Sequence, residues 1–135
     1  MANLDAFVGR WRLISSEGFE EFMKELGVGM AMRKMGSMAK PDVIFSRDGD
    51  VCTLKTESTF KTSEFKFKVG EPFDEDTLDG RKTKTLITLD DNNVLTQSQK
   101  WDGKEATITR KIVDGKLVVE CVMNSAKCTR VYQKV

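Results

Sequence analysis

Apolar and polar residues alternate along most of the chain, with the period of two that half-buried β-strands show. The alternation is strictest at 65–69 (FKFKV). From residue 42 onward, clusters of Asp, Asn and Gly interrupt the pattern about every ten residues, and such clusters favour tight turns. The pattern predicts sequential antiparallel strands, as in a barrel or a sandwich.

The strands predicted from this pattern follow one another with short turns between them. They are 7–14, 43–47, 51–57, 60–69, a short edge strand near 70–75, 82–89, 94–101, 105–113, 117–123 and 128–134. Sequential strands with short turns favour up-and-down connections. Nine or ten strands with one helical insertion therefore predict an all-β, up-and-down barrel with a helical lid.

The pattern changes to a helical period once, between the first two strands. Ser15 or Ser16 is expected to cap a first helix, and Gly27 to end it. A second short helix, rich in methionine, is expected to end before Pro41. The two helices form a predicted lid over about 16–39. One face of the first helix carries the i, i+3, i+4 and i+7 set Phe19, Phe22, Met23 and Leu26.

Charge and composition exclude several classes of function. The 135 residues include 22 basic and 21 acidic ones, so no overall field favours nucleic acid, which is not an expected partner. No run of apolar residues is long enough to span a bilayer. The N-terminus lacks the pattern of a signal peptide, so the cytosol is the expected compartment, with reduced thiols.

The residues that usually carry catalysis or bind metals are scarce. The chain has no histidine, which removes the commonest general base and the usual partner of a nucleophilic serine or cysteine. The cysteines Cys52, Cys121 and Cys128 lack the spacing of a zinc site. The acidic residues cluster at turns, most densely at 73–80 (FDEDTLDG), which is interpreted as loop. Neither an enzyme nor a metal site is expected.

Two predicted strands carry an arginine on a face that is otherwise apolar. Arg110 shares its side with Ile108 and Ile112, because alternate residues of a strand point the same way. Arg130 shares its side with Tyr132. Arginine is rarely buried without a partner, so this placement needs a physical reason.

The turn after residue 123 predicts how the last two strands pair. If 124–125 is a two-residue turn, Cys121 lies opposite Cys128 and Val119 lies opposite Arg130. Opposed residues point to the same side of a sheet, so Arg130 falls on the apolar side. The same register permits a disulfide between Cys121 and Cys128, although cytosolic thiols are expected to stay reduced.

Two interpretations of the arginines remain open. In a sandwich with one solvated face, both would simply be exposed. In a closed barrel, each unpaired buried cation costs several kcal/mol, and no acidic residue shares the face in these last three strands. An anion from outside would then compensate, and guanidinium and phenol groups offer donors that match a carboxylate.

Several longer stretches of the chain carry a resemblance to a known family. The whole chain resembles the intracellular fatty acid-binding proteins, most of all the epidermal type within the epidermal, adipocyte and myelin subgroup. The resemblance implies one domain over 1–135, a ten-stranded antiparallel up-and-down β-barrel (a clam) with a two-helix lid after the first strand. It also implies a long-chain fatty acid carrier that needs no cofactor. The matching stretches are FVGRWRL, GFEEFMKELGVG, RKMGSMAKP, FDEDTLDGRK, QKWDGK, TITRK, VECVM and CTRVYQK.

The resemblance also implies roles for single residues. Arg110, Arg130 and Tyr132 would bind the carboxylate. The loop at 89–95 (LDDNNVL) is one residue longer than the family pattern, so its path is open. The residues that match cavity or portal positions are Phe19, Met23, Val28, Met35, Gly36, Pro41, Phe60, Asp79, Arg81, Ile108, Val119 and Cys121.

The resemblance extends to partners. The lid residues Lys24, Arg33 and Lys34 match a nuclear-localisation patch, and they would also dock the lid transiently on anionic membranes. The expected protein is a monomer of the cytoplasm and the nucleus that delivers its ligand to membranes, enzymes or nuclear receptors. Two alternatives stay open: a carrier of retinoic acid or another retinoid, and a structural protein that stacks membranes, as in the myelin type.

Overall fold

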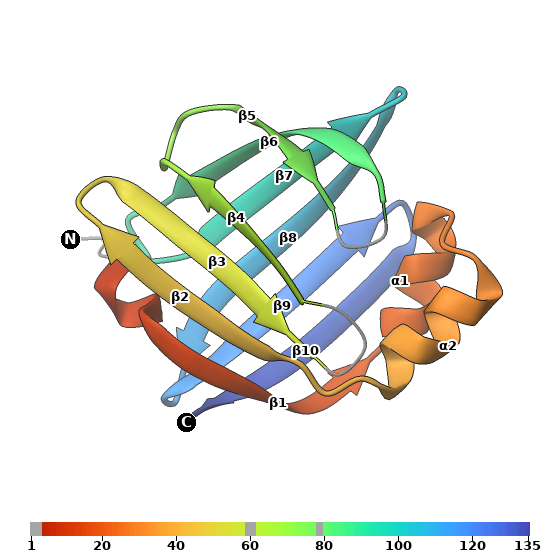
Figure 1. The fold of residues 1–135 in the computed structure, drawn as a ribbon, viewed down its shortest axis with the longest axis horizontal. Coiled ribbons are helices and arrows are strands. Elements are labelled where there is room, and N and C mark those ends of the chain that lie inside the picture. Colours follow the sequence, from red (N-terminus) through yellow and green to blue (C-terminus); the bar gives the residue numbers. More distant parts are fainter. Residues whose placement is uncertain (1–3, 59–61, 78–79) are drawn as a thin grey trace.

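The computed structural model describes residues 4–58, 62–77 and 80–135, and its ten strands form one antiparallel sheet (Figure 1). The elements are η1 (Leu4–Phe7), β1 (Gly9–Glu17), α1 (Phe19–Leu26), α2 (Met30–Met38), β2 (Asp42–Asp48), β3 (Val51–Glu57), β4 (Thr62–Phe67), β5 (Phe73–Asp76), β6 (Lys82–Leu89), β7 (Leu95–Trp101), β8 (Lys104–Val113), β9 (Lys116–Met123) and β10 (Ala126–Lys134).

The sheet curls into a barrel because the first and last strands pair with each other. The strand order is β4-β3-β2-β1-β10-β9-β8-β7-β6-β5. Apart from β1 and β10, all strands that are neighbours in the sheet are also consecutive in the chain. The prediction of a ten-stranded up-and-down barrel, with two helices inserted after the first strand, is confirmed.

β4 and β5 are the two ends of the sheet, and no strand pairing joins them within the described residues. Aromatic rings pack across this β4/β5 seam instead. The ring of Phe73 stacks on Phe65 at 5.8 Å and on Phe67 at 6.3 Å between centroids. The barrel is therefore nearly closed, by hydrogen bonds on all sides except one.

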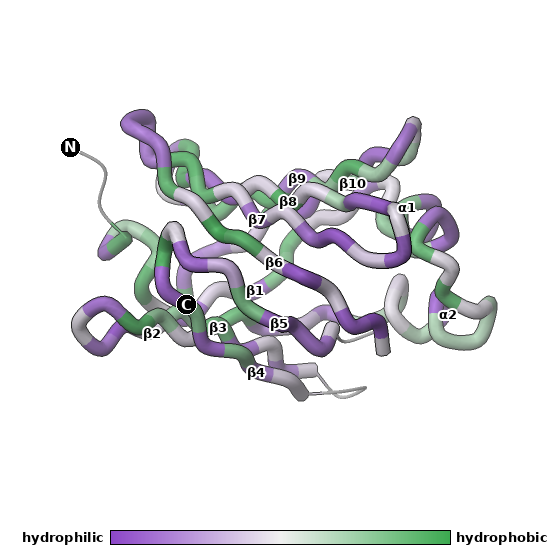
Figure 2. The backbone as a smooth tube through the Cα atoms, turned by 90° about the horizontal axis from the view of Figure 1, so that it is seen from above, coloured by the Kyte–Doolittle hydropathy of each residue, from purple (hydrophilic) through white to green (hydrophobic). Residues whose placement is uncertain are grey.

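The helices lie together at one end of the barrel, as the two perpendicular views show (Figures 1 and 2). α1 follows Gly18, whose φ of 75° is left-handed, and no side chain caps the helix. A Cβ on Gly18 would lie 2.2 Å from the carbonyl oxygen of Lys127, so only glycine fits here. The predicted cap by Ser15 or Ser16 is wrong, because both belong to β1, and the helical lid begins at residue 19 instead of 16.

The N-terminal strand also differs from its prediction. The expected start at residue 7 is wrong because Phe7 ends the short η1 turn, where its carbonyl accepts a 2.9 Å hydrogen bond from Trp11 Nε1. β1 then runs on to Glu17, past an irregularity in its pairing with β10 between Leu13 and Ser15. That irregularity lets the strand follow the curve of the barrel toward the lid.

The loop between β6 and β7, left open by the sequence, is organised by one carboxylate. Asp90 Oδ1 accepts hydrogen bonds from the backbone N–H groups of Asn92 (2.9 Å) and Val94 (3.0 Å). Asn93 adopts a φ of 63°, which asparagine tolerates better than most residues. The extra residue is thus absorbed in a compact turn, and β6 and β7 keep their register.

Buried and more exposed residues alternate along β6 and β7, as expected when one face of each strand points inward. Phe7 of η1 packs on Phe45 at 5.7 Å, and Trp11, which donates to the Phe7 carbonyl, is buried beside it. In Figure 1, η1 lies at the end of the barrel away from the helices. None of the helices in the described segments is long and apolar enough to cross a membrane.

Candidate functional site

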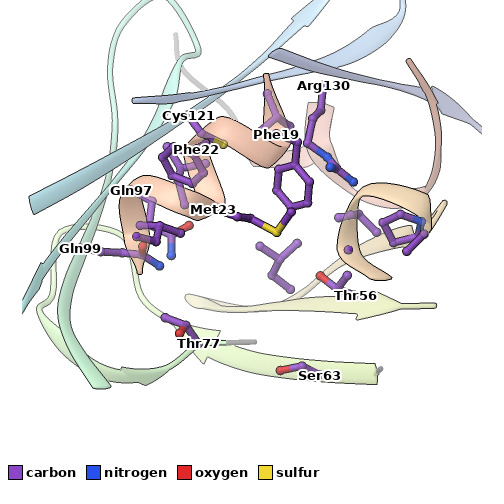
Figure 3. A pocket seen from close by; sticks show the side chains of 18 of the residues that line it. Phe19, Phe22, Met23, Thr56, Ser63, Thr77, Gln97, Gln99, Cys121 and Arg130 are labelled. Atoms are coloured by element: carbon purple, nitrogen blue, oxygen red, sulfur yellow. The ribbon is translucent and has the colours of Figure 1, made fainter. Parts of the chain in front are cut away.

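The barrel encloses a cavity of about 260 Å³ between the lid and the inner faces of the strands (Figure 3). Its lining is mainly apolar and includes Phe22, Met32, Val43, Leu54 and Phe65. Polar side chains also reach it, among them Gln97 and Gln99, which project inward from β7. A cavity of this composition suits a ligand with a long apolar part and few polar groups.

Most of the residues implied by the resemblance line this cavity. Met35 does not: about half of it is exposed, and α2 turns Met32 and Gly36 toward the cavity instead. Phe60 and Asp79 lie outside the described residues, so their placement stays a prediction. The residues that the structure brings to the cavity are Phe19, Met23, Val28, Gly36, Pro41, Arg81, Ile108, Arg110, Val119, Cys121, Arg130 and Tyr132.

Arg130 is buried among neutral groups. Only 5 % of its surface is exposed, and its guanidinium lies 3.8 Å above the ring of Phe19, a cation–π contact that Figure 3 shows. Its Nε donates to the Tyr132 hydroxyl at 3.3 Å, and its Nη1 donates to Ser16 Oγ at 3.4 Å. Among the described residues no carboxylate pairs with it. The cation is thus positioned to receive an anion.

Arg110 is balanced differently. Its Nη1 donates a 2.7 Å hydrogen bond to Oε1 of the buried Gln97. The accessible part of Arg110 faces the cavity. Burial lowers the pKa of the Arg110 guanidinium, and the nearby Cys121, Tyr132 and Glu75 oppose that shift. The structure therefore compensates this arginine from within the protein.

Glu75 supplies the compensation, and sequence reasoning missed it. It projects inward from β5, is only 6 % exposed, and accepts hydrogen bonds at Oε1 from Thr85 Oγ1 (2.8 Å), Gln97 Nε2 (2.8 Å) and Gln99 Nε2 (3.0 Å). The statement that no acid shares the arginines' face holds for the last three strands only. The alternation Phe73, Glu75, Thr77 was the available signal, but the dense acidic run resembled a loop.

The three basic lid residues do not share one environment. Lys24 and Lys34 are exposed. Arg33 is half-buried, and its Nη1 donates a 2.6 Å hydrogen bond to the carbonyl oxygen of Val28. Arg33 thus holds the connection between the two helices as well as carrying a charge.

The predicted pairing of the last hairpin is confirmed, since Cys121 pairs with Cys128 and Val119 pairs with Arg130. Both cysteines are buried free thiols. The hydrogen bond between the thiols, together with burial, raises the pKa of Cys121 well above its usual value. The disulfide between them stays a prediction.

The described residues contain no group of three or more side chains that could hold a metal ion. Chemically, the site offers one buried cation with neutral partners, a second cation paired through an amide, and an apolar volume beside them. This arrangement can bind an amphipathic anion.

Comparisons with known proteins agree on one family. The model of the Lipocalin / cytosolic fatty-acid binding protein family matches residues 8–135. Fatty acid-binding protein 5 of Pygoscelis papua is 71 % identical over 131 residues, which cover 97 % of this chain and 98 % of that relative. The protein of the same name from Rattus norvegicus is 63 % identical over 135 residues, covering 100 % and 99 %.

A solved structure extends the likeness to the fold. The fatty acid binding protein of Schistosoma mansoni, solved in complex with arachidonic acid, superposes with a TM-score of 0.93 at 35 % identity, over 98 % of each chain. The similarity therefore spans the barrel, the lid and the cavity between them.

Proposed function

This chain belongs to the lipocalin / cytosolic fatty-acid binding protein family, and we propose that it carries one long-chain fatty acid inside its barrel, with the carboxylate at Arg130 and Tyr132. The observation that carries the proposal is the buried guanidinium of Arg130. It has only neutral partners in the described structure and opens onto an apolar cavity. A ligand carboxylate would accept from Arg130 and from the Tyr132 hydroxyl together.

The apolar lining supplies most of the expected affinity. Burying roughly 15 methylene groups at about 0.8 kcal/mol each contributes on the order of 12 kcal/mol before the costs of ordering are subtracted. The ion pair contributes orientation more than affinity, because both charges lose their hydration when they meet. A net affinity between nanomolar and micromolar is expected.

Delivery by the lid is the second part of the proposal. Met30 and Met38 are 73 % and 78 % exposed on α2, and Lys24 and Lys34 are exposed on the same lid. Exposed thioethers next to lysines suit a brief contact with an anionic bilayer. We propose that the monomer works in the cytoplasm and the nucleus and transfers its ligand to membranes, enzymes or nuclear receptors.

Arg130→Gln tests the carboxylate assignment. We expect it to weaken oleate binding by about 1–3 kcal/mol, the scale of a charge-assisted hydrogen bond, while oleyl alcohol binds about as before. Isothermal titration of both ligands measures the difference. Arg47→Gln is the matched control, because Arg47 is exposed and pairs with Asp5 on the outer surface.

Unchanged oleate binding by Arg130→Gln would show that the carboxylate lies elsewhere. Competition by retinoic acid belongs in the same experiment. If retinoic acid displaces oleate at equal concentration, the chain is a retinoid carrier and the proposed ligand class is wrong. Aggregation of anionic liposomes by the purified protein would instead favour the membrane-stacking alternative.

A further inference from the structure

The carboxylate of Glu75 stands inside a cavity that is proposed to bind an anion. Such a charge opposes an anionic ligand, so it needs its own physical account. Its position is fixed, because Glu75 is buried and its Oε1 accepts three hydrogen bonds from β6 and β7. The carboxylate is therefore an ordered part of the cavity lining.

Glu75 is connected to two arginines through two glutamines. Arginine can only donate, so Gln97 must turn its oxygen to Arg110 (2.7 Å) and its NH2 group to Glu75 (2.8 Å). Gln99 repeats the arrangement: its oxygen accepts hydrogen bonds of 3.4 Å from Nη1 and Nη2 of Arg81, and its Nε2 donates to Glu75. Both amides are aligned by opposite charges at their two ends. Glu75 is therefore linked to Arg110 through Gln97 and to Arg81 through Gln99.

Glu75 compensates one of the two inward arginines, Arg110 and Arg130. It is linked to Arg110 through Gln97, and within the described residues no carboxylate pairs with Arg130. Arg130 is outside the glutamine network, and its polar partners are neutral. One ligand carboxylate would balance the charge of Arg130. A headgroup with two negative charges would leave one of them buried without compensation, which is costly in an apolar cavity.

We propose that Glu75 is a specificity-determining residue, which restricts the cavity to lipids whose headgroup carries a single negative charge and rejects single-chain phosphate monoesters. The inference rests on the proposed function, because it assigns a headgroup class to the same site. Without Glu75, Arg110 and Arg130 together would attract a dianion. With Glu75 present, Arg110 is compensated and Arg130 is left for the ligand.

A pair of ligands separates charge from size. Oleyl sulfate and oleyl phosphate share the chain and a tetrahedral headgroup, but at pH 8 the sulfate carries one negative charge and the phosphate close to two. Displacement of a fluorescent fatty acid from the full chain gives the affinity of each. The wild-type protein should prefer the sulfate by at least about tenfold. Glu75→Gln, which keeps the size and the hydrogen-bond acceptor, should abolish that preference or reverse it.

Two further variants complete the test. Glu71→Gln removes an exposed charge near β5 and should keep the wild-type preference, which excludes an effect of overall net charge. The double variant Glu75→Gln/Arg110→Gln removes one charge of each sign, leaves Arg130 as the cation for the ligand, and should restore the preference for the sulfate. If Glu75→Gln alone fails to fold, the double variant still tests the inference, because it contains no buried Arg110 without a compensating charge.

The outcomes are distinct. If Glu75→Gln binds oleyl sulfate well but still rejects oleyl phosphate, the headgroup is selected by shape and the inference is overturned. The same holds if the double variant accepts the phosphate. If the wild-type protein binds neither oleate nor oleyl sulfate, the carrier function itself is wrong. A purely structural role for Glu75 would weaken both ligands by the same factor and leave their ratio unchanged, which also overturns the inference.

Discussion

Gly18 joins β1 to the lid, and Gly18→Ala should destabilise the protein more than an ordinary glycine substitution. The residue has a left-handed φ of 75°, which costs an alanine about 1–2 kcal/mol. The new methyl group would also lie 2.2 Å from the carbonyl oxygen of Lys127 in β10, far inside contact distance. Relief of this clash needs a shift of about 1 Å in packed backbone, and such overpacking costs about 1–3 kcal/mol more.

Gly49→Ala provides the matched control. Gly49 also has a left-handed φ, 60°, but a Cβ there would meet nothing within 4 Å. It should lose only the conformational term, about 1–2 kcal/mol. Urea unfolding gives the free energy of unfolding of both variants, and Gly18→Ala should be the less stable by about 2 kcal/mol. Equal losses in the two variants would refute the reasoning, because the contact with Lys127 would then cost nothing.

Two further predictions concern charge on the lid and a buried thiol. Lys24→Gln/Lys34→Gln should slow fatty acid transfer to anionic vesicles and make the transfer rate less dependent on salt and on vesicle concentration. The control Lys116→Gln, in the β8–β9 hairpin, should leave the rate unchanged. Arg33 is not substituted, because it donates a hydrogen bond to the Val28 carbonyl. A transfer rate independent of salt and vesicles in the wild-type protein would mean that ligand leaves through water. Burial raises the pKa of the Cys52 thiol above its value in the unfolded chain, so the unfolded chain loses this proton at lower pH than the folded protein does. The contribution of the protonated thiol to the free energy of unfolding is therefore complete below about pH 8.5 and falls as pH rises. In urea unfolding, the free energy of unfolding of Cys52→Ala should decline less between about pH 8 and 10 than that of the wild-type protein. Equal declines in the two proteins would contradict this assignment.

The parts of the fold that the sequence could predict are those governed by local rules. The period of two and a two-residue turn were sufficient to pair Cys121 with Cys128 and to turn Arg130 inward. The start of the lid could not be predicted in this way. Gly18 has its conformation because another strand approaches it closely, and that approach exists only in the folded barrel.

In the candidate site too, residues that break a local pattern could be predicted, and residues that depend on contacts between distant strands could not. Arg110 and Arg130 stood out because each broke an apolar alternation. Glu75 did not, since β5 has only four residues and its neighbours are acidic as well. Its role becomes visible only when β7 brings Gln97 and Gln99 beside it, and a contact between distant strands leaves no mark in a local pattern.

The pairing of β1 with β10 also has a consequence for how the protein folds during synthesis. Ser16 pairs with Arg130, and the two are 114 positions apart in the chain. During synthesis β1 is complete long before β10 leaves the ribosome, so one edge of the nascent sheet waits unpaired. Contacts of such high sequence separation form late and make folding slow. Because Ser16, Phe19, Arg130 and Tyr132 meet only at this last closure, a nascent chain cannot capture a ligand before its barrel is complete.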